Sequence, residues 1–218
     1  MRFSVLNGGF HHLKDLLDHA SIPSSLWLRG ALLLLISVAL VSGKEEGKNP
    51  ELLSVPTPQG AVERMVELAE ILPQDLVYDL GCGDGRIVVT AALLRGARAV
   101  GVDIAPEQVL ASRKLAQEKG VENLVTIREG DIFDTDFGDA DVVFLYLRPH
   151  LIKKLIPQLR QLKSGARIIT FDFAMEGAKP ELVERGAFGE RAHCTIYKYT
   201  VPWVNDTGTI WDIFTTTP

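Results

Sequence analysis

The chain of 218 residues lacks the features of disulfide scaffolds, zinc proteins and nucleic-acid-binding proteins. Its two cysteines, Cys82 and Cys194, are far apart in sequence, so neither a disulfide framework nor a zinc ligand pattern is present. The five histidines are scattered without the spacing of metal ligands. The net charge is −5 and no cluster of lysine and arginine offsets it, so we expect no basic surface for nucleic acid. An acidic surface instead favours basic protein targets.

The chain also lacks a calcium loop, although one segment is rich in aspartate. The residues that suggest a metal site are Asp131, Asp134, Asp136, Asp139 and Asp141. The segment does not have the glycine and the terminal glutamate of a calcium loop. We therefore predict a solvated loop here and no bound metal.

Alternating glycines follow an apolar run that ends at Asp79. Residues 79–86 read Asp-Leu-Gly-Cys-Gly-Asp-Gly-Arg. Glycine adopts positive φ easily and lets the backbone approach a ligand with no Cβ in the way. Alternating glycines also occur in plain surface turns, but these stand between a predicted strand and a predicted helix. We predict a glycine loop whose ligand contacts are Asp79, Gly81, Cys82, Gly83, Asp84 and Gly85.

The carboxylates of this loop indicate the class of ligand. A loop that binds pyrophosphate offers backbone N–H groups and a helix N-terminus to negative oxygens, where carboxylates are unfavourable. The dehydrogenase fingerprint G-x-G-x-x-G also needs its third glycine one position after Gly85. Both features disfavour NAD and ATP. A positively charged ligand without phosphate fits better, and S-adenosylmethionine, with its sulfonium and ammonium groups, is such a ligand.

Two further acids extend the predicted site. Asp103, which Ile104 follows, lies 24 positions after Asp79, about where an acid that binds a ribose diol is expected. The alternative is that Asp103 only caps the helix after it. We assign Asp131, at the tip of another strand, to the amino group of the base, and the backbone N–H of Ile132 to its ring.

Strands and helices alternate through most of the chain. Apolar runs predict strands at 76–78, 99–102, 125–127, 142–146 and 167–173, and the remaining patterns predict helices at 86–95, 106–119 and 151–162. Asp84 is the expected N-cap of the first of these helices, and Pro157 should bend or split the last. Segments 195–199 and 209–214 predict an antiparallel pair around a turn at 205–208. The pattern indicates an open, mostly parallel α/β sheet with its ligand at the carboxyl ends of the strands.

With these residues in place, the chain resembles the class I S-adenosylmethionine-dependent methyltransferases. The resemblance rests on the loop at 79–86, on Asp103, on the pair Gly130 and Asp131, and on the terminal hairpin. It implies a Rossmann-like sheet of seven strands, mostly parallel, with a C-terminal antiparallel hairpin. It also implies that S-adenosyl-L-methionine is the cofactor.

Three stretches are more selective, and they resemble the ATP synthase c-subunit lysine methyltransferases and related archaeal protein-lysine methyltransferases. They are the Val-Pro-Thr-Pro element at 55–58 with the helix after it, the fourth strand at 140–147 and the fifth at 167–173. This resemblance implies methyl transfer to a lysine of a protein substrate. The Asn/Asp-Pro-Pro-aromatic motif of enzymes that methylate adenine or glutamine amides is absent, because residues 145–149 read Leu-Tyr-Leu-Arg-Pro.

Two residues are candidates for catalytic roles. In-line transfer from a sulfonium needs an approach at about 3 Å, little water and a neutral amine. Tyr146, at the end of the fourth strand, is expected to orient the amine, and the alternative is that its ring packs the cleft. Thr57 is expected to cap a helix that begins at Pro58 and to touch the cofactor or the amine, and the alternative is a cap alone. The apolar stripe expected to pin that helix to the sheet consists of Val62, Met65, Val66, Ala69 and Leu72.

The N-terminal region predicts a hydrophobic helix at residues 26–43. The segment carries no charge except that of one arginine, and it is short for a membrane span of about 20 residues. The segment is either a single membrane anchor or a signal segment cleaved on export. Because the methyl donor is made in the cytosol, we prefer a membrane-anchored enzyme that faces the cytosol. Residues 1–25 are an uncertain extension, 44–54 a linker and 55–218 the methyltransferase domain.

The sequence therefore favours one function and leaves two alternatives. The favoured function is a protein-lysine N-methyltransferase that acts on a deprotonated amine, with a protein as partner and no nucleic acid. The first alternative is a methyltransferase for a small, membrane-soluble acceptor. The second is a non-enzymatic scaffold that binds S-adenosylmethionine.

Overall fold

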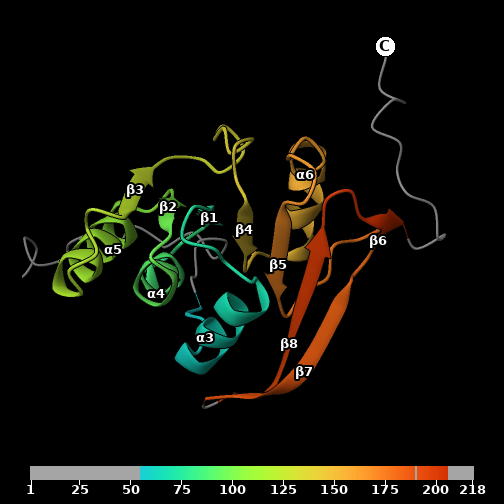
Figure 1. Ribbon diagram of the computed structural model, residues 1–218, viewed down its shortest axis with the longest axis horizontal. Helices are drawn as coiled ribbons and strands as arrows, with labels where there is room; N and C mark the ends of the chain where they lie inside the picture. The colour runs from blue at the N-terminus through green and yellow to red at the C-terminus, as the bar shows by residue number, and fades with distance from the viewer. Residues whose placement is uncertain (1–54, 190, 206–218) are drawn as a thin grey trace, which may run out of the picture. The chain divides into compact units, whose positions relative to one another are not determined.

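The computed structural model describes residues 55–189 and 191–205, in which a seven-stranded sheet carries helices on both faces (Figure 1). The strand order is β3-β2-β1-β4-β5-β8-β7. The strands are β1 (Leu76–Leu80), β2 (Arg98–Asp103), β3 (Val125–Glu129), β4 (Val142–Leu145), β5 (Arg167–Phe171), β7 (Leu182–Phe188) and β8 (Arg191–Thr200). Strands β1 to β5 are parallel, and β8 runs antiparallel to both β5 and β7. A separate two-stranded ladder joins β6 (Ala178–Lys179) to β9 (Val204–Asn205).

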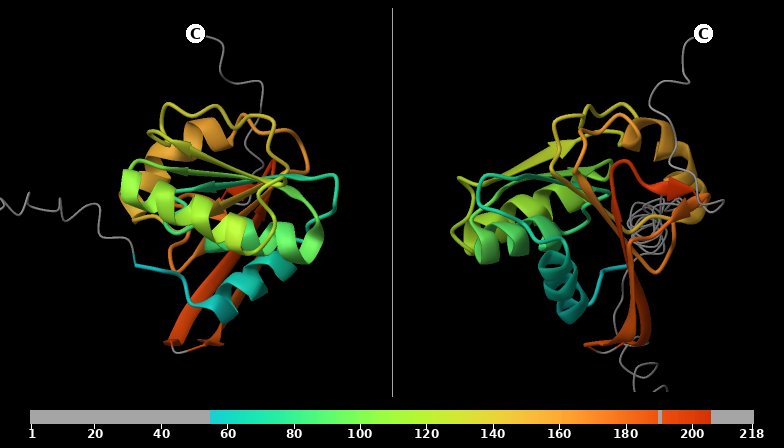
Figure 2. Two further views of the ribbon diagram at one scale, coloured as in Figure 1. Left: turned by 90° about the vertical axis from the view of Figure 1, so that its left-hand side faces the viewer. Right: turned by 45° about the vertical axis from the view of Figure 1, so that its right-hand side comes forward.

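Four described helices cover the two faces of the sheet. They are α3 (Gln59–Leu68), α4 (Arg86–Arg95), α5 (Pro106–Glu118) and α6 (Pro149–Leu159). Helices α3, α4 and α5 pack on one face and α6 on the other, as Figure 2 shows. The central strands are therefore covered on both sides, which explains why β4 is apolar and buried at every position.

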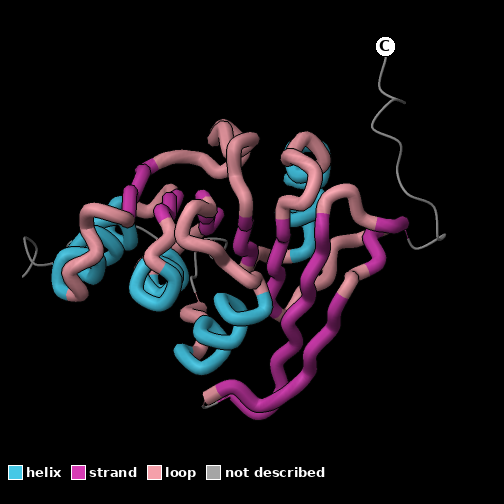
Figure 3. Tube along the Cα trace, viewed as in Figure 1, coloured by secondary structure: helices cyan, strands magenta, loops and turns pink. Residues whose placement is uncertain are grey.

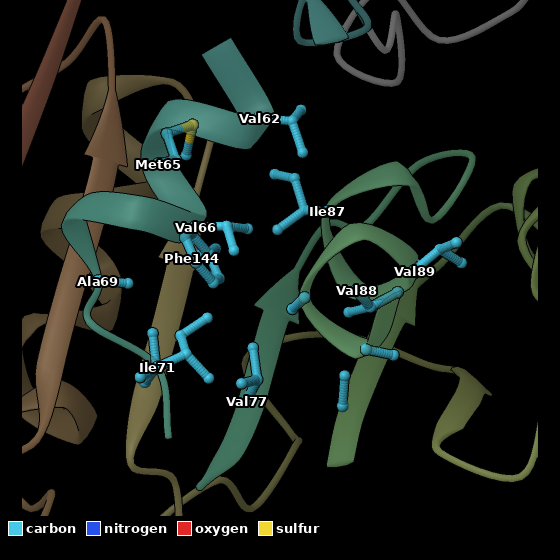
Figure 4. Close-up of a cluster of buried hydrophobic side chains, with 14 of the residues drawn as sticks. Val62, Met65, Val66, Ala69, Ile71, Val77, Ile87, Val88, Val89 and Phe144 are labelled. Atoms are coloured by element: carbon cyan, nitrogen blue, oxygen red, sulfur yellow. The ribbon is translucent and has the colours of Figure 1, made fainter. Parts of the chain in front are cut away.

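Helix α3 contributes its apolar side to the core on its face of the sheet (Figure 4). Val62, Met65, Val66 and Ala69 are fully buried, as the stripe predicts. Burial of such side chains stabilises the fold by roughly 1.5–3 kcal/mol each. Leu72 does not belong to the stripe, because the helix ends before it and its side chain is 49% exposed.

Polar contacts also tie α3 and the turn after it to the antiparallel edge of the sheet. Arg64 donates two hydrogen bonds to Glu184 on β7, at 2.7 and 2.6 Å. Arg167 on β5 donates to the carbonyl of Ala69 at 3.1 Å and pairs with the buried carboxylate of Asp75. Figure 3 shows α3 beside the long β7–β8 pair to which it is joined. Helix α3 and the turn after it are thus held by β7 and β5, which follow much later in the sequence.

Two predicted helix caps need correction. The N-cap position of α4 is Gly85 and not Asp84, and helix α3 begins at Gln59 after Pro58 without a side-chain cap, so Thr57 is not a cap. Pro157 lies inside α6, which it does not split, and a bend at this proline stays a prediction. Strand β8 pairs with β7 and β5, whereas the predicted partner at 209–214 lies outside the described residues.

Localisation at a membrane is a further correction. Within residues 55–189 and 191–205, no helix combines the length and the apolar character needed to cross a bilayer. We therefore withdraw the predicted membrane-anchored enzyme and its membrane partner. The predicted extension at 1–25, anchor or signal helix at 26–43 and linker at 44–54 all lie outside the described residues.

Arg167→Met is expected to lower the free energy of unfolding by about 2–4 kcal/mol, because it leaves a buried carboxylate unpaired. The carboxylate is that of Asp75, whose side chain is 6% exposed. The matched control is Lys114→Met, since Lys114 and Glu118 are 76% and 56% exposed and their pair contributes less than about 0.5 kcal/mol. Urea denaturation of both variants measures the difference, and equal losses would contradict this account of Arg167.

Candidate functional site

The glycine loop joins β1 to α4 in a tight, left-handed path. Gly81, Gly83 and Gly85 have φ of 82°, 54° and 79°, a region in which residues other than glycine are strained. The N–H groups of Gly81 and Cys82 both donate to the carbonyl of Val102, at 2.8 and 2.9 Å. These bonds turn the loop back onto the end of β2.

Close packing is a second reason for glycine in this loop. A Cβ added at Gly85 would lie 2.8 Å from the Cβ of Ser112 on α5, and one at Gly81 would lie 2.9 Å from a methyl of Leu147. Ser112 also donates from Oγ to the carbonyl of Gly83 at 2.6 Å. Beneath the loop, burial raises the pKa of the Cys82 thiol, so this cysteine is neutral and serves packing.

Asp79, the last residue but one of β1, is an ionisable group with an unmet partner. Its side chain is 2% exposed, and its Oδ2 has no hydrogen-bond partner. Burial raises the pKa of this carboxyl to about 8, and the charges of Asp103 and Asp84 add to the effect. Buried polar atoms are rarely left without a partner, so the unpaired oxygen indicates that a ligand supplies one.

The second acid of the loop, Asp84, already has a cationic partner. Arg86 donates from Nε and Nη2 to its carboxylate, at 2.9 and 2.5 Å, and from Nη1 to the carbonyl of Thr57 at 2.6 Å. Burial alone would raise the pKa of Asp84, but the hydrogen bonds and charge of Arg86 outweigh it and lower that pKa. Asp84 nevertheless lines the cavity beside the loop, so a ligand contact for both loop acids stays a prediction.

Asp103 ends β2 beside the glycine loop. Its two carboxylate oxygens accept from the N–H of Gly83 at 2.8 Å and from that of Ala105 at 2.9 Å. The N-cap residue of α5 is Ala105, which has no side-chain cap, so the alternative of Asp103 as a cap is wrong. Ile104, beside it, is an apolar side chain left 53% exposed. Such a surface suits the flat face of a purine.

Asp131 follows β3 at the same end of the sheet. Its Oδ1 accepts from the N–H of Phe133 at 2.9 Å, which fixes the turn that contains Ile132. The N–H of Gly130 donates to the carbonyl of Asp103 at 3.0 Å, so the ends of β2 and β3 are joined. The predicted ribose acid and the predicted base acid therefore lie on adjacent strand ends.

A cavity of about 180 Å³ opens between the glycine loop and the segment before α3. Its lining residues are Val55, Pro56, Thr57, Cys82, Gly83, Asp84, Arg86 and Gln108. Thr57, 5% exposed, is thus brought to the loop as predicted, although by the pairing of Arg86 with its carbonyl and not by capping. Sequence reasoning missed Arg86 and Gln108; the position of Arg86 directly after the last glycine was the available signal for the first.

Tyr146 lies beside a different group of residues, at the ends of β4 and β5. Its ring packs edge-on against Phe171, with centroids 4.9 Å apart, and is roughly parallel to Phe173 at 6.5 Å. Arg191 donates from Nη1 to the Tyr146 hydroxyl at 3.0 Å, and its Nη2 forms an ion pair with Asp172 at 2.9 Å. We call Tyr146, Phe171, Asp172 and Phe173 the aromatic–carboxylate cluster. Sequence reasoning missed Arg191, which no local pattern marks.

The residues present fit S-adenosylmethionine. The unpaired oxygen of Asp79 suits a cation, the close backbone approach at the loop leaves no room for a Cβ, and the exposed Ile104 suits a base. None of the described residues forms a cluster of metal ligands. That the protein binds no metal stays a prediction.

Comparison with known proteins places the chain among methyltransferases. Residues 79–182 match the family model described as the ANTKMT methyltransferase domain. The chain is 37% identical over 154 residues to a protein-lysine N-methyltransferase of Saccharolobus islandicus, which covers 70% of this chain and 95% of the relative. It is 32% identical over 130 residues to the human ATP synthase c-subunit lysine N-methyltransferase, covering 59% of this chain and 55% of that protein.

A solved structure also matches. It is described as an RNA methyltransferase from Salinibacter ruber in complex with S-adenosyl-L-homocysteine. It is 44% identical, covers 68% of this chain and 94% of its own, and superposes with a TM-score of 0.64.

Gly85→Ala is expected to weaken S-adenosylhomocysteine binding at least about tenfold and to cost about 2–4 kcal/mol of stability, through backbone strain and overpacking. The control is Gly96→Ala. Gly96 has a similar φ of 66° but nothing within 4 Å of the added Cβ, so strain alone acts there. Calorimetry and urea denaturation measure both effects. Equal losses in the two variants would show that contact with Ser112 does not matter.

Asp79→Asn is expected to abolish the pH dependence of cofactor binding. Since the pKa of Asp79 is about 8 in the free protein, an ammonium ligand must displace its proton, and affinity should rise between pH 6 and 7.5. Calorimetry in buffers of different ionisation enthalpy detects the released proton. A released proton that persists in Asp79→Asn would contradict this assignment.

The same substitution is expected to act on stability in the cofactor-free protein. The folded pKa of about 8 exceeds the ordinary 3.8, so the protonated form stabilises the fold fully below pH 3.8. That contribution is lost as the pH rises to 8. Asp79→Asn should therefore flatten the fall in Tm over this range, which thermal denaturation at several pH values measures.

Proposed function

The chain belongs to the family of S-adenosylmethionine-dependent methyltransferases that includes the Saccharolobus islandicus protein-lysine N-methyltransferase, and from this we propose that it methylates a lysine side chain of a protein. The observation that carries the proposal is the 37% identity, which extends over 95% of that relative and so includes more than a cofactor-binding loop.

We assign the ends of β1, β2 and β3 to the cofactor. Asp79 would hold the ammonium group through its unpaired oxygen, and Asp103 the ribose diol through its remaining lone pairs. Ile104 and the turn at Asp131 and Ile132 would hold the base. S-adenosylmethionine, when bound, would supply a methyl group on a sulfonium. The sulfur leaves as a neutral thioether, so no acid is needed to protonate it.

The acceptor amine requires more from the protein than the donor does. A lysine ammonium has a reference pKa of about 10.4, and only its neutral form is a nucleophile. The ammonium must therefore lose its proton before transfer, and Tyr146 retains a lone pair that can orient the neutral amine. Thr57 is buried and lines the cavity beside the glycine loop, where it would limit the access of water to the methionine part of the cofactor.

An RNA acceptor is the second candidate, because the Salinibacter ruber structure with 44% identity is described as an RNA methyltransferase. The net charge of −5 speaks against it, since affinity for nucleic acid depends on phosphate contacts with lysine and arginine. In the site, Arg86 and Arg191 are both paired with aspartates. We therefore favour protein.

The test is methyl transfer from labelled S-adenosylmethionine to a cell lysate that has been divided into protein, RNA and organic extract. We expect label in the protein fraction, recovered as methyllysine after hydrolysis. Gly83→Arg should abolish it, because a side chain there would fill the cavity beside the loop. The control is Gly138→Arg, an exposed glycine in another loop.

Each other distribution of label supports a different acceptor. Label in RNA alone would replace lysine with RNA, and label in the organic extract alone would indicate a small molecule. Cofactor binding without label in any fraction would favour the non-enzymatic scaffold.

A further inference from the structure

The guanidinium of Arg191 lies in a site built to hold a cation. It is hydrogen-bonded to Tyr146 and ion-paired with Asp172, and its Cζ lies 5.7 Å from the centre of the Phe171 ring. An aromatic face, a carboxylate and a hydroxyl are the groups that recognise a cationic side chain. The occupant is an arginine of the same chain.

The aromatic–carboxylate cluster lies beside the glycine loop. Leu80 and Leu145, the last residues of β1 and β4, are paired, so Gly81 and Tyr146 directly follow two adjacent strand ends. The side chain of Leu147 closes against Gly81. A side chain held by the cluster therefore lies next to the loop where the cofactor's methionine part would be.

The carboxylate of the cluster is presented by a strained backbone. Asp172 has φ of 61°, a left-handed conformation that is uncommon for residues other than glycine. The strain is maintained by β8, since Asp172 N–H donates to the carbonyl of Thr195 at 2.7 Å and Thr195 N–H donates to Asp172 Oδ1 at 3.2 Å. The other oxygen, Oδ2, remains for Arg191. Local strain of this kind is common where a site is shaped for a ligand.

Arg191 is held loosely enough to leave. Its side chain is 40% exposed, and Phe173 on the opposite side of the cluster is 37% exposed. Its contacts with Tyr146 and Asp172 are those of a partly exposed ion pair, which contributes little to stability.

We propose that the aromatic–carboxylate cluster is the binding site for the target lysine and that Arg191 is an internal competitor, which the incoming lysine displaces. The inference rests on the proposed function, whose substrate class it explains: an acceptor must be a long, cationic side chain to exchange with a guanidinium. After displacement, the ammonium contacts Asp172 and the rings, and it loses its proton to water before transfer.

Kinetics with Nα-acetyl-lysine amide as the acceptor tests the proposal. Arg191→Ala should lower KM about threefold to tenfold, because it removes a competitor held by one ion pair and a cation–π contact, while kcat and cofactor affinity change little. Phe173→Ala and Asp172→Asn should raise KM by a similar factor. Asparagine tolerates the left-handed backbone, so the latter variant changes only the charge. The matched control is Arg185→Ala, an exposed arginine of the same hairpin.

Two kinetic results would overturn the proposal. An unchanged KM in Arg191→Ala would show that Arg191 does not compete with the acceptor. A fall in kcat of more than about tenfold at constant KM would instead make Arg191 a positioning residue for Tyr146.

A binding measurement separates this proposal from the proposed function. The measurement is an NMR titration with Nα-acetyl-lysine amide in the presence of saturating S-adenosylhomocysteine. We expect the Nε–H resonance of Arg191, which is assigned by its absence from the spectrum of Arg191→Ala, to shift. The norleucine analogue, which has no amino group on its side chain, should not shift it. A shift without any lysine methylation would retain the cation site and reject the function. If the lysine probe causes no shift, or if only adenosine causes one, the cluster is not the binding site for lysine.

Discussion

The buried carboxyl group of Asp79 is the constraint around which the site is arranged. It lies near the end of β1, an inner strand of the sheet, where its side chain is almost fully buried, and one of its oxygens has no protein partner. The other acids of the loop region are occupied, since Asp103 accepts from backbone N–H groups and Asp84 pairs with Arg86. Among these three acids, Asp79 alone therefore keeps a buried carboxyl oxygen without a partner. A cationic ligand that contacts this oxygen would bind only the folded protein and would therefore stabilise the fold.

The proposed acceptor site depends on a different part of the molecule. Two adjacent strand ends supply Tyr146 and the segment from Phe171 to Phe173, but β8 holds the backbone of Asp172 and supplies Arg191. Strands β7 and β8 in turn hold α3 through Arg64 and Glu184, and the segment before α3 carries Thr57 to the loop. The donor site and the acceptor site thus share one support. A disturbance of the β7–β8 pair should reach both, since they are mechanically joined.

The sequence predicted what short-range patterns determine. Strand β4 is a continuous apolar run because both of its faces are buried, and the glycines at 81, 83 and 85 mark positive φ directly. The sequence could not predict pairings made across long separations. Strand β7 alternates between exposed and half-buried positions and carries no continuous apolar run, so its pairing with β8 was missed. Arg191 is one charged residue among many until β8 places it against Tyr146.

The charge of the acceptor follows from the same arrangement. At this end of the sheet stand Asp79, Asp84, Asp103, Asp131 and Asp172. Arg86 and Arg191, which lie among them, are each paired with an aspartate, so these acids dominate the field that an approaching polyanion would meet. A cationic side chain meets the opposite field, and it can exchange with a guanidinium that already defines its contacts. The electrostatics that select a sulfonium donor therefore also select an amine acceptor, and one acidic strand-end region accounts for both substrates.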